Sequence, residues 1–231
     1  MHTGNQEQAR ENMAIQQIRP WDVHDERVLE VVRIVPREHF VPKAYSGLAF
    51  ADTEVPLGHN QAMMPPRLEA RMLQALDIQP SEKVLEIGTG SGFVTACMAR
   101  LGNSVTSFEI IPELSQQAQN HLTGLGINNV KLSIGNGLDS ELHQGAKYDV
   151  IAVTGSLIHQ ITALENLLSE NGRMFLIEGS APVMEAILVS RMPDGEIERQ
   201  KLFETYLPSL QQNKSTSSHN YLRFYLSAFP A

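Results

Sequence analysis

Short apolar runs alternate with amphipathic stretches through the middle of the chain. Five of the runs have the length and composition of buried strands, at 83–87, 104–109, 130–134, 148–153 and 172–177. Apolar positions at helical spacing lie between several of them, at 92–101, 112–124 and 160–168. Strands that alternate with helices predict parallel β-α-β units, and therefore an α/β fold with a doubly wound, mostly parallel sheet.

The two ends of the chain have other patterns. Residues 1–80 predict a helical extension, with one helix between Asp25 and Pro36 and another after Pro66. Between these helices, residues 44–66 are rich in proline and in short or flexible residues, which predicts a loop. Residues 81–231 are expected to form one compact ligand-binding domain, whose last part, 181–231, reads as strands and loops. Within that part, Pro193-Asp194-Gly195 predicts a hairpin turn.

The first predicted strand runs into three glycines at alternate positions, Gly88, Gly90 and Gly92, with Thr89 and Ser91 between them. Glycine lets a backbone turn tightly and approach a ligand closely. A dinucleotide loop would need Gly or Ala at position 93, where this chain has Phe, and no Gly-Lys-Ser or Gly-Lys-Thr marks a phosphate-binding loop. Glu86 precedes the glycines, and its carboxylate would repel a pyrophosphate but attract an ammonium or a sulfonium.

Two further elements follow the next two predicted strands. Glu109, followed by Ile110, ends the second strand, where its carboxylate can accept hydrogen bonds from both hydroxyls of a ribose. Asn136 and Gly137 follow the third strand, and the Asn amide could bind an adenine edge, although Asn-Gly alone is more typical of a turn. Since all three elements lie at the carboxyl ends of successive strands, together they predict a site for S-adenosylmethionine.

Composition narrows the function classes. The net charge is −8 and the 18 basic residues are scattered, which argues against nucleic acid as a partner. No apolar run approaches the roughly 20 residues that span a bilayer. The N-terminus is polar rather than signal-like, so a cytoplasmic protein without membrane partners is expected. The single cysteine, Cys97, is expected to be buried and unreactive, and the eight histidines are too dispersed to predict a metal site.

The stretch from Val84 to Phe93 resembles motif I of class I methyltransferases. From about residue 10 to about residue 180 the chain resembles the protein-L-isoaspartate O-methyltransferase family. The matching segments are Gln17–Trp21, Asp25–Leu29, Val35–Pro42, Leu48–Asp52, Pro56–His59, Val84–Gly92, Tyr148–Asp149 and Asn171–Arg173. The resemblance implies a Rossmann-like sheet of seven strands. It also implies a protein-repair enzyme that moves a methyl group from S-adenosylmethionine to an isoaspartyl carboxylate in damaged proteins, with S-adenosylhomocysteine as product.

The chain departs from this family in the loop that the resemblance places beside the acceptor. The family's Thr-Ile-Ser-Gln-Pro is replaced, so that Ala62 stands for the Thr and Met64 for the Ser, and no catalytic hydroxyl can be assigned there. The residues expected on the acceptor side are His59, Gln61, Met63 and Met64. A second departure is expected to form a loop at 153–158 that also borders the acceptor. Two alternatives stay open, a paralogous methyltransferase with a more apolar acceptor and a non-catalytic protein that binds the cofactor. The oligomeric state is not indicated.

Overall fold

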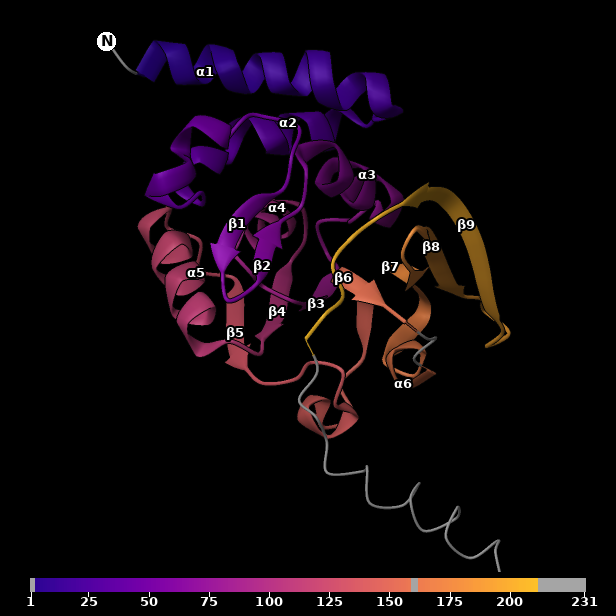
Figure 1. Ribbon diagram of the computed structural model, residues 1–231. Helices are drawn as coiled ribbons and strands as arrows, with labels where there is room; N and C mark the ends of the chain where they lie inside the picture. The colour runs from indigo at the N-terminus through magenta and orange to yellow at the C-terminus, as the bar shows by residue number, and fades with distance from the viewer. Residues whose placement is uncertain (1–2, 159–161, 212–231) are drawn as a thin grey trace, which may run out of the picture.

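The computed structural model describes residues 3–158 and 162–211, which form a twisted sheet with helices packed against it (Figure 1). The sheet has seven strands in the order β5-β4-β3-β6-β7-β8-β9. The first five strands in this order are parallel to one another, β8 is antiparallel to β7, and β9 is antiparallel to β8. The strands are β3 (Lys83–Ile87), β4 (Ser104–Glu109), β5 (Val130–Ile134), β6 (Tyr148–Leu157), β7 (Leu168–Ser180), β8 (Val183–Arg191) and β9 (Ile197–Thr205). The predicted α/β fold with a mostly parallel sheet is confirmed.

Helices connect the parallel strands. They are α4 (Phe93–Leu101), α5 (Pro112–Gly124), the short 3-10 helix η5 (Ser140–His143) and α6 (Thr162–Glu165). The helix predicted over 160–168 is wrong at its end, because Leu168 pairs with Tyr148 as the start of β7, and residues 159–161 lie outside the described part. The turn predicted at Pro193-Asp194-Gly195 is confirmed, since it joins β8 to β9.

The N-terminal extension is helical, as predicted. The α2 helix begins where expected, since the carboxylate of Asp25 accepts the N–H of Arg27 at 2.8 Å and caps its first turn. Pro66 opens α3, where its missing N–H costs nothing. The helices are α1 (Thr3–Asn12), η1 (Met13–Ile18), η2 (Arg19–Trp21), α2 (Glu26–Ile34), η3 (Arg37–His39), η4 (Lys43–Leu48) and α3 (Pro66–Leu76).

The stretch 44–66 is more regular than predicted. Besides η4 it contains an antiparallel hairpin of β1 (Val55–Gly58) and β2 (Gln61–Met63). His59 and Asn60 form its tip with φ of 52° and 57°, the left-handed backbone that a tight hairpin turn requires. Asn tolerates this conformation because its amide can bond locally, so the turn is encoded in a sequence that otherwise looks irregular.

Two hydrophobic clusters cover the two faces of the sheet. Successive residues of β3 point to opposite faces, so that Val84 joins one cluster and Leu85 the other. The Val84 cluster also contains Leu29 of α2 and Leu73 of α3, so the extension packs directly on the sheet. Cys97 lies in the same cluster, fully buried as predicted, and burial raises the pKa of its thiol. None of the helices in the described ranges has the length and apolar character to cross a membrane.

Candidate cofactor and acceptor site

The glycine loop turns sharply where β3 ends. The N–H groups of Gly88 and Thr89 both donate to the carbonyl of Phe108 in β4, at 2.9 and 3.3 Å. Gly88 has φ of +98°, and a Cβ there would overlap Thr154 Oγ1. Gly92, with φ of +86°, lies just before α4 and packs against Ala118 of α5. The loop therefore needs glycine both for its backbone angles and for its close packing.

Glu109 closes the loop from the side at the end of β4. Its Oε2 accepts the N–H of Gly90 at 2.8 Å, and its Oε1 accepts the N–H of Ile111 at 3.0 Å. The side chain is 5% exposed, so these bonds fix its orientation. Because a carboxylate oxygen can accept two hydrogen bonds, each oxygen keeps a free position for a ribose hydroxyl.

Asn136 follows β5, where its side chain both forms a turn and leaves an amide group available to a ligand. Its amide oxygen accepts the N–H of Leu138 at 3.2 Å and so forms a turn. Its amide nitrogen has no hydrogen-bond partner among the described residues, and it is free to donate to a ligand. Behind it, Gly137 packs so tightly on Phe108 and Ile87 that a Cβ would lie 2.8 Å from the Cβ of Phe108.

These strand ends surround one cavity, which we call the cofactor cavity. It brings together six of the residues expected to bind the cofactor: Gly88, Gly90, Glu109, Ile110, Asn136 and Gly137. Its lining also includes Leu57, Gln61 and Ala62 of the β1–β2 hairpin. Loops far apart in the chain therefore meet at the carboxyl ends of β3, β4 and β5, where ligands bind on open parallel sheets.

The segment after β9 forms a wall of the cofactor cavity, and no sequence motif predicts this wall. In Figure 1 it runs from the end of β9 down toward the β1–β2 hairpin. Ser156 donates its N–H to Pro208 and accepts the N–H of Leu210, each at 3.0 Å. Farther along, Gln211 Nε2 donates to the carbonyl of His59 at 3.2 Å. Residues 207–211 thus bridge β6 and the hairpin.

A second cavity adjoins the first at the glycine loop, and we call it the acceptor cavity. Met63 and Met64 form part of its wall, while their side chains are also buried in the core. Residues 58–66 contain no hydroxyl side chain, whereas three residues of other segments that line this cavity do. These three residues are Thr89, Ser91 and Thr154.

Thr154 lies in a stretch that sequence analysis interpreted as a loop. That prediction is wrong, because β6 continues to Leu157. The pairing of β6 with β7 is irregular between Ala152 and Ser156. At this irregularity Thr154 and Gly155 line the cofactor cavity. Thr154 Oγ1 lies 2.9 Å from the carbonyl oxygen of Ile87 and also bonds to that of Gly88. Bulges are hard to anticipate from a single strand, because they depend on the partner's register.

Glu86 is fully buried beneath the glycine loop and also borders the acceptor cavity. Its Oε2 accepts the hydroxyls of Ser107 and Thr95, both at 2.5 Å. Its Oε1 is buried and has no partner within the described parts of the chain. Burial raises the pKa of this carboxyl to about 8, partly opposed by the two hydroxyls. Without a ligand the side chain is therefore a neutral acid at pH 7, and a cationic group placed beside Oε1 would favour its ionised form.

The raised pKa of Glu86 predicts a pH-dependent stability. In the unfolded chain the carboxyl ionises near 4.5, whereas in the folded protein it does so near 8. Between these values the folded state holds the extra proton, so the free energy of unfolding falls as pH rises, by about 1 kcal/mol per unit. Glu86→Gln should flatten this slope in urea titrations from about pH 5 to about pH 8. An unchanged slope would contradict the assignment.

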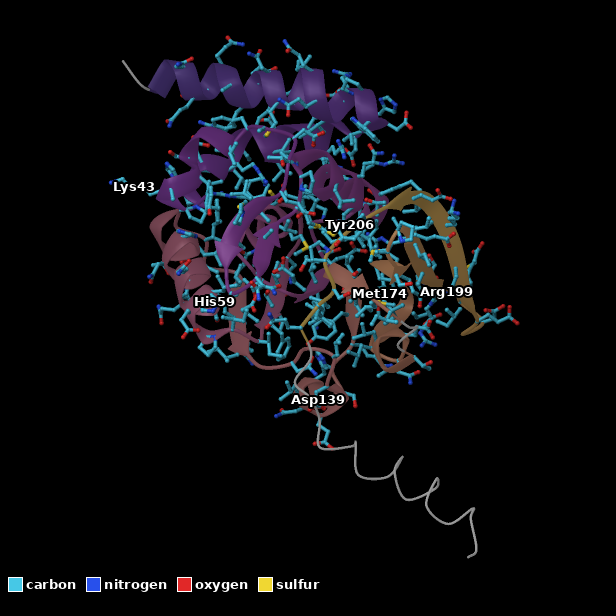
Figure 2. All side chains as sticks on the ribbon, viewed as in Figure 1. Lys43, His59, Asp139, Met174, Arg199 and Tyr206 are labelled. Carbon is cyan, nitrogen blue, oxygen red and sulfur yellow. The ribbon has the colours of Figure 1, made fainter. Side chains whose placement is uncertain are left out.

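The β1–β2 hairpin contains the two other residues expected on the acceptor side, Gln61 and His59, and of these only Gln61 lines one of the cavities among the described residues. Gln61 lines the cofactor cavity. His59 lies at the hairpin tip, as Figure 2 shows, where it is exposed and outside the lining of the three cavities in the described parts of the structure. Its backbone carbonyl, bound by Gln211, is its link to the site. A role for the His59 side chain in binding the acceptor stays a prediction.

A buried ion pair supports the acceptor cavity from below. Arg37 and Glu69 pair with exposed side-chain fractions of 0% and 3%. Arg37 Nη2 donates to the carbonyl of Met64 at 2.9 Å, so the pair holds the backbone of the acceptor wall. Burial raises the pKa of Glu69, while Arg37 acts in the opposite direction. This pair was not predicted from the sequence, because its partners come from η3 and α3.

No cluster of three or more candidate metal ligands occurs in the described ranges.

Comparison with known proteins agrees with this arrangement. The family model described as Protein-L-isoaspartate(D-aspartate) O-methyltransferase (PCMT) matches residues 8–214. A protein-L-isoaspartate O-methyltransferase of Gloeobacter violaceus is 36% identical over 87% of this chain and 98% of its own length. The one of Koribacter versatilis is 36% identical over 90% of this chain and 93% of its own length. The chain belongs to this family.

A solved structure shares this fold. A putative protein-L-isoaspartate O-methyltransferase from Plasmodium falciparum, in complex with S-adenosyl-L-homocysteine, superposes with a TM-score of 0.75 at 21% identity. The match covers 88% of this chain and 99% of that one. At this identity the likeness concerns the fold, and it confirms the Rossmann-like sheet of seven strands expected for the family.

Proposed function

We propose that this member of the family transfers a methyl group from S-adenosylmethionine to the side-chain carboxylate of isoaspartyl residues in polypeptides. One observation carries the proposal. The cofactor cavity and the acceptor cavity meet at a common wall formed by Leu57, Ala62, Gly88, Gly90 and Thr154. Two cavities that share a wall can hold a methyl donor and a methyl acceptor in contact, which is the main requirement of a direct transfer.

The residues of the cofactor cavity fit S-adenosylmethionine. Glu109 offers two carboxylate oxygens to a ribose, and the Asn136 amide offers N–H donors to an adenine. Glu86 borders the neighbouring acceptor cavity, and its unpartnered Oε1 would accept an ammonium N–H once the carboxyl is ionised. When bound, the cofactor supplies a methyl group already activated on sulfur. The protein's contribution is therefore to orient the two reactants and exclude water.

The acceptor cavity can position a carboxylate without the family's loop hydroxyls. Ser91 accepts the N–H of Phe93 at 3.3 Å, while its own proton has no acceptor in the described structure. This hydroxyl can donate to a carboxylate in the cavity. An ionised carboxylate is itself the nucleophile, so no general base is needed. The loss of hydroxyls at Ala62 and Met64 thus changes how the acceptor is held and leaves the chemistry possible.

The proposal is tested by methyl transfer to a short isoaspartyl peptide. The protein is incubated with S-adenosylmethionine labelled in the methyl group, and base-labile label is counted. Label should appear with the isoaspartyl peptide and stay at background with the same peptide containing normal aspartate. If calorimetry shows cofactor binding and no label appears, the isoaspartyl assignment is wrong.

A second candidate is a methyltransferase for a more apolar acceptor. It is favoured by the wall of Met63 and Met64, whose thioether side chains adapt to varied apolar shapes. Label on an aromatic or aliphatic carboxylic acid in place of the peptide would support it. Cofactor binding without label on any acceptor would instead favour a binding protein.

A further inference from the structure

A third cavity lies apart from the cofactor, between α3 and the end of β9, and we call it the α3–β9 cavity. Its volume of about 360 Å³ lies in the range typical of ligand sites. Trp21 and Tyr206 contribute to its wall and are 47% and 55% exposed. Figure 2 shows Tyr206 where the chain leaves β9. Large aromatic side chains exposed at a cavity are typical of recognition surfaces.

Two arginines, one helical turn apart on α3, point into this cavity. The guanidinium of Arg67 lies 4.4 Å from the centre of the Trp21 ring and forms an ion pair with Asp52. That of Arg71 lies 3.9 Å from the centre of the Phe203 ring. Arg71 has neither a hydrogen bond nor an ion pair within 3–158 and 162–211. A guanidinium stacked on a ring keeps its N–H edge free, and that edge matches a carboxylate.

The same cavity borders an open strand edge. The sheet ends at β9, so the outer N–H and C=O groups of this strand have no neighbouring strand in the described fold. Residues Phe203–Tyr206, at its end, line the cavity. An extended polypeptide can add to such an edge through its backbone and place alternate side chains in adjacent pockets.

The α3–β9 cavity and the acceptor cavity are neighbours along the chain. Met64 lines the acceptor cavity, and the next residue, Pro65, lines the α3–β9 cavity. On the opposite side, Tyr206 lines the α3–β9 cavity, and the next residue, Leu207, lines the cofactor cavity. Adjacent residues are about 3.8 Å apart, so a polypeptide of a few residues can reach from one cavity into the other.

We propose that the α3–β9 cavity binds the segment of the polypeptide acceptor next to the methylated residue, and that Arg71 pairs with an acidic side chain of that segment. The inference rests on the proposed function, because it takes the acceptor to be a polypeptide. Two carboxylates also line the cavity. Glu204 is paired with Lys201 at 3.1 Å, while Glu54 faces the cavity unpaired within the described residues. Glu54 disfavours a polyanion, so the site suits a single acidic residue.

Trp21 is the only tryptophan in the chain, so its fluorescence reports binding at this cavity directly. Two isoaspartyl peptides serve as probes, with glutamate or lysine at the positions flanking the isoaspartyl residue. The glutamate peptide should quench Trp21 at about 5-fold lower concentration, the effect of one partly exposed ion pair. Arg71→Glu should reverse this preference. The matched control, Arg100→Glu, changes an exposed arginine on α4 and should leave it unchanged.

The outcomes separate this inference from the proposed function. If no peptide is methylated while Arg71→Glu still reverses the binding preference, the subsite stands and the isoaspartyl assignment fails. If both peptides are methylated and Arg71→Glu binds them with the original preference, with its fold intact by circular dichroism, the subsite is overturned. Equal binding of the two peptides to the unmodified protein overturns it as well.

Discussion

Gly88→Ala is expected to lower the affinity for S-adenosylmethionine by about 100-fold. Gly88 has φ of +98°, which costs an alanine on the order of 1–3 kcal/mol. Its Cβ would overlap Thr154 Oγ1 and would lie 3.2 Å from Leu210 Cδ2. Thr154 cannot retreat freely, because its hydroxyl bonds to the carbonyls of Ile87 and Gly88. The loop must therefore shift, and losing about two hydrogen bonds between its backbone and the cofactor would lower the affinity on the order of 100-fold.

Calorimetric titration of both proteins with the cofactor measures this effect. Gly124→Ala is the matched control, since Gly124 ends α5 without a positive φ and has open space around its Cβ position. It should bind like the unmodified protein. If Gly88→Ala folds and retains full affinity, the glycine loop does not bind the cofactor, and the assignment of the whole cavity fails.

The cofactor side could be predicted from sequence because its signals are local. Each element, the glycine loop, Glu109 and Asn136, follows directly after a strand that its apolar pattern reveals. Parallel strands then bring their carboxyl ends to one edge without further information. The helices at α2 and α3 were equally predictable, because Asp25 and Pro66 mark their first turns.

The acceptor side depends on contacts between distant segments, which a single sequence does not encode locally. Thr154 reaches the cavities through an irregularity in the pairing of β6 with β7. Leu210 does so through hydrogen bonds between its segment and Ser156. The loss of hydroxyls in the loop around Met64 therefore does not decide by itself which hydroxyls the cavity contains. The cavity regains a free hydroxyl from Ser91, whereas the hydroxyl of Thr154 is bonded to the carbonyls of Ile87 and Gly88.

Glu69→Ala is expected to reduce the free energy of unfolding by about 3–5 kcal/mol, since it leaves the Arg37 guanidinium buried without a counter-charge. Urea denaturation measures the loss. The matched control is Glu26→Ala, which removes an ion pair between Arg19 and Glu26, whose side chains are 47% and 65% exposed. This control should reduce the free energy of unfolding by less than about 1 kcal/mol. A Glu69→Ala protein as stable as the control would show that water reaches Arg37.

Removing both partners separates stability from positioning. Taking two charges out of water costs about as much as their mutual attraction returns, so this buried pair itself adds little net stability. Arg37→Met combined with Glu69→Leu should therefore recover most of the loss seen with Glu69→Ala. It also removes the donor to the Met64 carbonyl, so the acceptor wall loses its support. We expect this double variant to bind the cofactor normally and to methylate its acceptor about 10-fold more slowly. Full activity would mean that the pair serves folding alone.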